Sequence, residues 1–418
     1  MRERRAAEDG RGMATIMAAG TVTLALAFGV RSVFGVALEP LSADLGWPRE
    51  TFALSLAIQN LVWGLAQPAF GALADRHGDR SALWTGFALY VAGMALSASG
   101  ATPLAQHLGA GALVGMGVSG TAFGLVLSVV GRAAPEHRRM QALGLVSALG
   151  AAGQVLLPLL AQQVLAAADW RGMLWAMTAA LLPVALCIPF LKAPPPRRGA
   201  GAAPAVPLGV AMRRAFSHPS YLLLVMGFFV CGFHVAFITA HFPAYVAEVC
   251  AAFSLFGREV TPEALGAATI SLVGLANVAG TLLASRLAAR WPKPYVLSAI
   301  YALRAAVILV FLWTPVSPLT VVLFSLTIGI LWLSTVPLTS ALVAGMFGTG
   351  SMATLYGFVF LSHQIGSFAG VWMGGRLYDL TGSYDIVWAV AIGLGAFSAL
   401  VHLPIREQAW SPPGAAAA

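Results

Sequence analysis

Long apolar runs separated by short polar segments dominate the chain. Crossing a hydrocarbon core of about 30 Å takes roughly 20 apolar residues in a helix, and twelve such windows occur along the 418 residues. The expected spans are 13–39, 52–73, 82–100, 104–131, 140–166, 173–191, 220–246, 263–288, 294–313, 319–343, 354–374 and 387–404. The first run is too long for a secretory signal, so we interpret it as a retained helix. The pattern predicts an all-α membrane protein with twelve transmembrane helices.

Composition and charge support this prediction. Hydrophobic residues make up 59% of the chain and charged residues 10%, whereas soluble domains carry roughly 25% charged residues. The net charge of +8 does not indicate nucleic-acid binding, because the basic residues lie mostly in short gaps between apolar runs. With the N-terminus inside, the cytoplasmic segments hold 18 Lys and Arg and the outside loops hold 4. This asymmetry predicts that both termini are cytoplasmic, in a multi-pass protein of the cell inner membrane.

A linker divides the apolar runs into two sets of six. The segment from Lys192 to Phe216 is rich in Pro, Gly and Ala, as linkers are. Three residues of the first run have counterparts 203 positions later, in the pairs Arg31–His234, Phe34–Phe237 and Pro40–Pro243. Internal repeats of this kind are common in transporters. We therefore predict a six-helix half at 13–191, a cytoplasmic linker at 192–219 and a second half at 220–405.

A short motif follows the second predicted span. The residues Gly71-Ala-Leu-Ala-Asp75-Arg76-His-Gly78-Asp-Arg80 resemble the G-x-L-A-D-R-x-G-x-[RK] signature of the major facilitator superfamily. Glycine permits a tight turn here, and Asp75 could cap a neighbouring helix or pair with a basic residue such as Arg132. The resemblance implies a cytoplasmic latch, which assigns Gly71, Asp75, Arg76, Gly78 and Arg80 to gating. The alternative is an ordinary positively charged loop.

Four basic residues fall deep within apolar runs: Arg31, His234, Arg304 and His363. An arginine at a helix centre costs roughly 2.5–3.5 kcal/mol on insertion scales, and no acidic residue lies at that depth to pair with it. A bound anion would supply the missing negative charge. Arg31 and His234 each precede a proline by nine residues, so we expect them to face each other near the bilayer middle. For Arg304 we favour a structural or interhelical role.

Further candidates surround this expected anion site. His234 and His363 are proton-coupling candidates, because histidine titrates near physiological pH, although either could be a packed polar residue. Gln59, Asn277, Trp332 and Tyr356 are candidates for substrate binding. Amides can equally hydrogen-bond a facing helix, and an aromatic side chain can simply pack.

Several chemistries have no matching pattern in the sequence. A G-x-x-x-x-G-K-[ST] phosphate loop, H-E-x-x-H and C-x-x-C zinc patterns and a G-x-S-x-G elbow are missing, and these motifs mark nucleotide, metal and hydrolase sites. We therefore predict no enzyme activity, no cofactor and no metal site.

The stretch Arg31-Ser-Val-Phe-Gly-Val-Ala-Leu-Glu-Pro-Leu-Ser-Ala-Asp-Leu-Gly-Trp47 resembles the first helix and outside loop of the monocarboxylate and oxalate/formate transporter branch. The resemblance implies a monomeric secondary transporter for a small organic anion, working by alternating access with a proton in symport or with a counter-anion. Several relatives carry a cation on helix 8 or a lysine on helix 11, where this chain has Asn277 and His363, so the substrate and coupling ion stay open. The alternatives are an efflux pump of the same superfamily and a transporter-like membrane sensor.

Overall fold

The computed structural model describes residues 2–135, 139–192, 208–255, 257–347 and 352–407. In the first part of the chain the helices are α1 (Arg2–Ser32), α2 (Phe34–Leu45), α3 (Arg49–His77), α4 (Asp79–Ser99), α5 (Pro103–Gln106), the π-helix η1 (His107–Leu113), α6 (Val114–Thr121), α7 (Phe123–Ala133), α8 (Arg139–Gly150), α9 (Ala152–Ala167), α10 (Trp170–Leu181), α11 (Pro183–Cys187) and the 3₁₀ helix η3 (Ile188–Phe190). In the second part they are α12 (Leu208–Phe216), α13 (Pro219–Val249), α14 (Pro262–Ala288), α15 (Lys293–Trp313), α16 (Pro318–Ile330), α17 (Thr335–Phe347), α18 (Met352–Thr381) and α19 (Asp385–His402).

The predicted membrane-spanning segments are helical. Within the described residues, ten stretches are long and apolar enough to cross a membrane. Helices α3 and α18 correspond to the other two predicted spans. They are 29 and 30 residues long, which exceeds the length needed for a bilayer. The prediction of an all-α membrane fold is confirmed.

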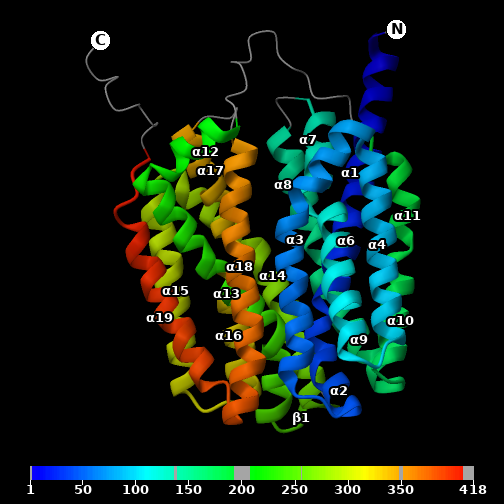
Figure 1. Ribbon diagram of the computed structural model, residues 1–418, viewed down its shortest axis with the longest axis vertical. Helices are drawn as coiled ribbons and strands as arrows, with labels where there is room; N and C mark the ends of the chain where they lie inside the picture. Colours follow the sequence, from blue (N-terminus) through cyan, green and yellow to red (C-terminus); the bar gives the residue numbers. More distant parts are fainter. Residues whose placement is uncertain (1, 136–138, 193–207, 256, 348–351, 408–418) are drawn as a thin grey trace.

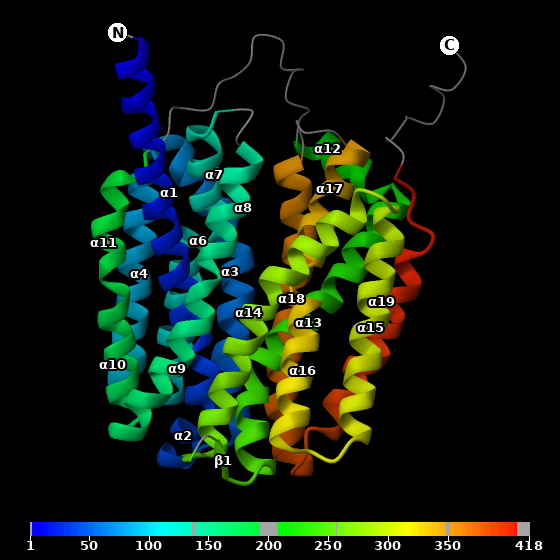
Figure 2. The same ribbon diagram turned by 180° about the vertical axis from the view of Figure 1, so that it is seen from behind.

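The helices form two bundles that stand side by side (Figures 1 and 2). Elements α1 to η3 make the N-terminal bundle, and α12 to α19 make the C-terminal bundle. We call the end where α1 begins and α19 finishes the proximal end. The opposite end, where α2 lies, is the distal end.

Local departures from straight transmembrane helices occur in both bundles. The second part of the predicted linker forms the short helix α12, whereas residues 193–207 lie outside the described chain. A two-stranded antiparallel ribbon, β1 (Phe253–Leu255) with β2 (Arg258–Val260), sits at the distal end. Between α16 and α17 the helix is interrupted at residues 331–334. Such an interruption leaves carbonyl groups without helical partners, and these need other donors.

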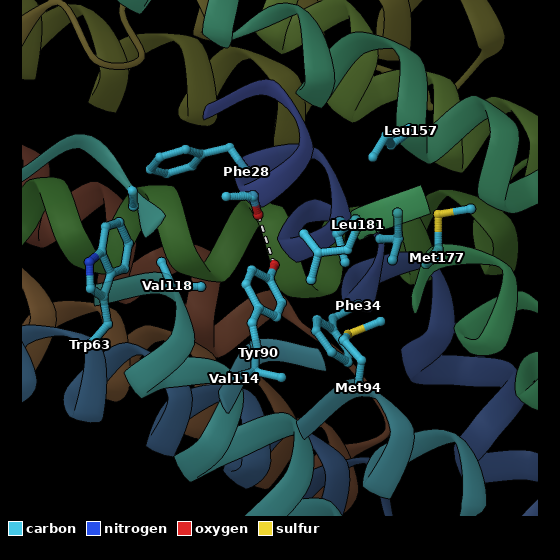
Figure 3. Close-up of a cluster of buried hydrophobic side chains, with 14 of the residues drawn as sticks. Phe28, Phe34, Trp63, Tyr90, Met94, Val114, Val118, Leu157, Met177 and Leu181 are labelled. Carbon is cyan, nitrogen blue, oxygen red and sulfur yellow. Dashed lines mark hydrogen bonds between the residues drawn. The ribbon is translucent and has the colours of Figure 1, made fainter. Parts of the chain in front are cut away.

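The core of the N-terminal bundle combines close helix approach with large apolar side chains. A Cβ added to Gly86 would lie 2.6 Å from the Cα of Gly120, so α4 and α6 can approach this closely only with glycine at that contact. Tyr90 is fully buried, and its hydroxyl donates to the carbonyl of Ala27 at 2.8 Å, as Figure 3 shows. This bond ties α4 to α1 inside an otherwise apolar cluster.

Three seams join the bundles. Helix α3 packs along α18, α9 packs against α14, and α2 packs against α13. In the α9–α14 seam, Ser271 donates to the carbonyl of Val155 at 2.5 Å. In the α2–α13 seam, Gly35 lies so near the carbonyl of Thr239 that a Cβ would meet it at 2.1 Å. The seams place residues of α1, α2, α3, α13 and α18 around one shared region between the bundles.

Candidate functional site

Arg31 lies in a small cavity between the bundles. The cavity has a volume of about 20 Å³, room for a single water molecule. Its lining comes from both bundles and comprises Arg31, Phe34, Gly35, Leu56, Gln59, Asn60, Ala236, Thr239, Ala240 and Val371. The last turn of α1 thus presents a cation at the bundle interface.

The partners of Arg31 are neutral. Its guanidinium donates to Oδ1 of Asn60 on α3 and lies 5.1 Å from the ring centre of Trp63, close enough for a cation–π interaction. Its Nε is buried and has no hydrogen-bond partner among the described residues. None of the ion pairs in the described parts of the chain involves Arg31. The site therefore holds a positive charge whose hydrogen-bonding capacity is only partly used.

A hydrogen-bonded chain leads from Asn60 to His363. The amide Nε2 of Gln364 on α18 donates to the backbone carbonyl of Asn60 at 3.0 Å. The Oε1 of the same amide lies 2.9 Å from Nδ1 of His363. The imidazole of His363 is buried between the rings of Phe228 and Phe360, at centroid distances of 5.0 and 5.7 Å. The structure thus links two predicted site residues, Arg31 and His363, through Asn60 and Gln364.

His234 does not face Arg31, so the expected pairing across the interface is wrong. Its Nε2 donates to the carbonyl of Ala391 on α19 at 2.8 Å. The face of α13 that lines the Arg31 cavity carries Ala236, Thr239 and Ala240. At about 100° of rotation per residue, His234 points to the other side of that helix, into the C-terminal bundle.

Asn277 and Trp332 lie at the helix interruption and not in the Arg31 cavity. The Oδ1 of Asn277 on α14 accepts the backbone N–H of Leu333 at 3.0 Å. The carbonyl of Trp332 accepts a hydrogen bond from Arg304 on α15. Together these contacts hold the segment between α16 and α17, which agrees with a structural role for Arg304.

Gln59 and Tyr356 occupy two different places near the site. Gln59 lines the Arg31 cavity, but its Nε2 donates to the carbonyl of Ala110 at 2.7 Å, which fixes it to the N-terminal bundle. Tyr356 on α18 packs near Phe228, with ring centres 6.4 Å apart. Since Phe228 also contacts His363, Tyr356 belongs to the surroundings of that histidine.

The motif between α3 and α4 makes its described contacts within the N-terminal bundle. Gly78 has a φ of +87°, a conformation that favours glycine. Arg132 on α7 pairs with Asp79 at 2.5 Å, and Arg80 donates to the carbonyl of Pro189. The partner predicted for Arg132 was Asp75, whose side chain lies outside the described structure.

At the distal end, charged residues lock the two bundles together. Arg49 of α3 pairs with Glu248 of α13 at 3.2 Å, and Glu50 pairs with Arg376 of α18 at 3.0 Å. Asp379 of α18 accepts the backbone N–H groups of Arg49 and Glu50 at 3.0 and 2.6 Å. We call these five residues the distal lock. The carboxylate of Asp379 caps the N-terminus of α3 across the interface between the bundles.

Asn60, Gln364 and the distal lock were not among the site residues predicted from the sequence. Asn60 and Gln364 are amides inside apolar runs, and this position was the feature of the sequence that could have identified them. Adjacent amide and imidazole groups at 363–364 also indicated a polar position in the middle of a span. The distal lock joins residues more than 190 positions apart, so local patterns gave no indication of it.

Comparisons with known proteins agree with this architecture. The family model of the Major Facilitator Superfamily matches residues 20–371. Human monocarboxylate transporter 11 is 28% identical over 405 residues, covering 90% of this chain and 79% of the relative. The uncharacterized MFS-type transporter YcxA of Bacillus subtilis (strain 168) is 29% identical over 191 residues, or 43% of each chain.

Solved structures share the fold. The crystal structure of a bacterial homolog to the human lysosomal transporter Spinster, in an inward-facing and unoccupied conformation, has a TM-score of 0.73 at 15% identity. That match covers 96% of this chain and 99% of the other. The chain folds into two bundles with a cation at their interface, and the family model covers most of the sequence. The chain therefore belongs to the major facilitator superfamily of secondary transporters.

Proposed function

We propose that this transporter moves a small organic anion of the monocarboxylate type, and that the substrate carboxylate binds Arg31. The observation that carries the proposal is the buried guanidinium of Arg31, which has one neutral hydrogen-bond partner and an unpartnered Nε within the described residues. A carboxylate can accept two N–H bonds from a guanidinium in parallel. The distant similarity to monocarboxylate transporter 11 over 90% of the chain supports the same substrate class.

Transport follows the alternating-access scheme, in which the two bundles rock about the Arg31 site. We propose that the distal end faces the outside and that both termini are cytoplasmic, in the inner membrane. The coupling is a proton taken up by His363 or the exchange of one anion for another. His234 is the weaker proton-coupling candidate, because its Nε2 is engaged with the carbonyl of Ala391.

The first prediction concerns Arg31. We expect Arg31→Ala to reduce anion uptake into proteoliposomes by roughly ten- to hundred-fold, since a hydrogen bond to a charged group contributes about 1.5–3 kcal/mol. Arg31→Lys should retain part of the uptake, because it keeps the charge without the planar fork. Arg290→Ala is the matched control: it removes an exposed arginine far from the cavity. Unchanged uptake by a normally inserted Arg31→Ala protein would reject the proposal.

A thermal-shift screen of the purified protein tests the substrate class. The compounds are small mono- and dicarboxylates, amines and sugars. Stabilisation confined to carboxylates supports the proposal, and greater stabilisation at lower pH supports proton coupling. Stabilisation by amines alone would favour an efflux pump. Binding of carboxylates without flux in proteoliposomes would favour a membrane sensor.

Symport and exchange differ in what drives uptake. An inward proton gradient should accelerate uptake into empty vesicles if His363 carries a proton. Preloading the vesicles with unlabelled anion should accelerate uptake, with or without a gradient, if exchange is the mechanism.

A further inference from the structure

Gln364 occupies the point where the α3–α18 seam reaches the Arg31 cavity. Its side chain is fully buried, with 0% exposure. It donates to the carbonyl of Asn60 in the N-terminal bundle and accepts from His363 in its own bundle. A single amide therefore joins the residue that binds Arg31 to the candidate proton carrier.

The carbonyl of Asn60 determines the direction of these hydrogen bonds. A carbonyl oxygen can only accept, so the amide nitrogen of Gln364 must face it and the amide oxygen must face His363. The accepting oxygen in turn requires a proton on Nδ1 of His363, which leaves Nε2 as the nitrogen that can take up a second proton. While the bundles touch at this point, Gln364 fixes the tautomer of His363.

Other polar groups near His363 include the thiol of Cys231 on α13 and Ser367 one turn further along α18, whose Oγ lies 3.5 Å from Nδ1. Cys231 also bonds Thr335 at 3.2 Å and contacts Arg304 at 3.6 Å. Within the described structure, no carboxylate pairs with His363. The amide of Gln364 is thus the acceptor that orients the ring.

Gly64 makes the Gln364 contact possible. A Cβ at Gly64 would lie 2.8 Å from both Cβ and Cγ of Gln364, closer than non-bonded carbon atoms approach. Next to it, the rings of Trp63 and Phe360 meet with centroids 5.3 Å apart. Toward the proximal end, Pro68 is already exposed. The contact between Gly64 and Gln364 therefore lies near the proximal limit of the tightly packed part of the seam.

We infer that Gln364 is a positioning residue that couples the anion site to the proton site. It holds the Asn60 segment of α3 against Arg31 and sets the His363 tautomer only while the seam is closed. When the bundles separate at the distal end, the hydrogen bond between Gln364 and Asn60 breaks. The Asn60 segment and the His363 ring then lose the support of Gln364 at the same time. The inference rests on the proposed function, since it assigns roles to Arg31 and His363 in anion and proton binding.

The same contact can be disturbed from either bundle. Gln364→Ala removes the amide, and Gly64→Ala displaces it from the opposite helix without changing Gln364. The matched control is Gly357→Ala on α18, where an added Cβ has no atom within 4 Å. All variants are made in the full-length protein.

Hydrogen exchange without any ligand gives the first readout. We expect Gln364→Ala and Gly64→Ala to raise exchange roughly two- to ten-fold in peptides covering 57–68 and 360–367, as expected for the loss of one hydrogen bond. Peptides from α4 and α15 should match the wild type, as should the Gly357→Ala protein throughout. Wild-type exchange in both seam variants, or an equal rise in the control, would overturn the inference.

Acetate uptake gives the second readout. Since Gln364 is not itself one of the residues that line the cavity, its loss should lower the maximal rate far more than it raises KM. Gln364→Glu should not rescue the rate, because a carboxylate cannot donate to the carbonyl of Asn60. A change confined to KM would contradict the inference. If Arg31→Ala leaves acetate uptake intact, the proposed function fails, while the exchange measurement still decides whether Gln364 closes the seam.

Discussion

At the scale of single residues, Arg304 shows how a buried cation can be held without a carboxylate. Its side chain is 1% exposed. Its Nε and Nη2 donate to the carbonyl of Leu331 at 3.0 and 2.5 Å, and Nη2 also donates to the carbonyl of Trp332. These carbonyls lie just beyond the C-terminus of α16, the negative end of the helix dipole. The break between α16 and α17 thus places the negative end of a helix dipole beside Arg304. In return, the guanidinium of Arg304 donates to carbonyls that the break leaves without helical partners.

We therefore predict that Arg304→Met destabilises the protein by about 2–6 kcal/mol, because two buried carbonyls lose their donor at about 1–3 kcal/mol each. The change keeps an unbranched, largely apolar side chain but removes the charge and every hydrogen-bond donor. Thermal unfolding in detergent is the measurement, with Arg290→Met as the exposed control. Equal melting temperatures for the two variants would contradict the prediction.

At the scale of elements, the N-terminus of α3 depends on a helix from the other bundle. The N-cap position of α3 is Pro48, which offers no side-chain acceptor. Asp379 of α18 supplies one instead by accepting the N–H groups of Arg49 and Glu50. The stability of the first turn of α3 is thereby linked to closure of the distal end.

Asp379→Ala should accelerate hydrogen exchange in the first turn of α3, since a lost helix cap costs about 0.5–2 kcal/mol. Asp385→Ala is the control, because Asp385 lies at the same end of the molecule but in the first turn of α19. High salt should reproduce part of the effect in the wild type by screening the exposed ion pairs of the distal lock. Exchange at the wild-type rate in the first turn of α3 of the Asp379→Ala protein would show that this helix does not need the cap.

The elements were largely predictable, because each span needs only about 20 apolar residues in sequence. The two amide partners were not, since hydrogen bonding across a seam depends on helix rotation. His234 illustrates this. It lies only two residues before Ala236, which lines the Arg31 cavity, but the rotation of the helix points it toward Ala391 instead. Similarly, Arg132 pairs with Asp79 at the start of α4, an acid that the sequence analysis did not propose as its partner. Sequence patterns place residues along a helix at membrane depth, but neighbouring helices decide which face each residue occupies.

At the scale of the whole molecule, α1 begins and α19 ends at the same end of the bundles (Figure 1). The asymmetry of 18 basic residues against 4 predicts that this end faces the cytoplasm. A reporter that is active only in the cytoplasm should therefore work when fused to either terminus. A fusion at residue 257 in the ribbon loop should be inactive. Activity of that internal fusion together with silence at the termini would reverse the orientation.

The distal lock also determines what an incoming ion meets when the bundles separate. On the N-terminal bundle, Arg49 and Glu50 offset each other, and the uncapped start of α3 adds roughly half a positive charge. On the C-terminal bundle, Glu248 and Asp379 outnumber Arg376 and leave one negative charge. Within the distal lock, separation therefore leaves the more positive set of charges on the bundle that carries Arg31 and the more negative set on the other bundle. A negatively charged solute that passes between the separated lock residues would be attracted more to the side that carries Arg31, and a cation more to the opposite side.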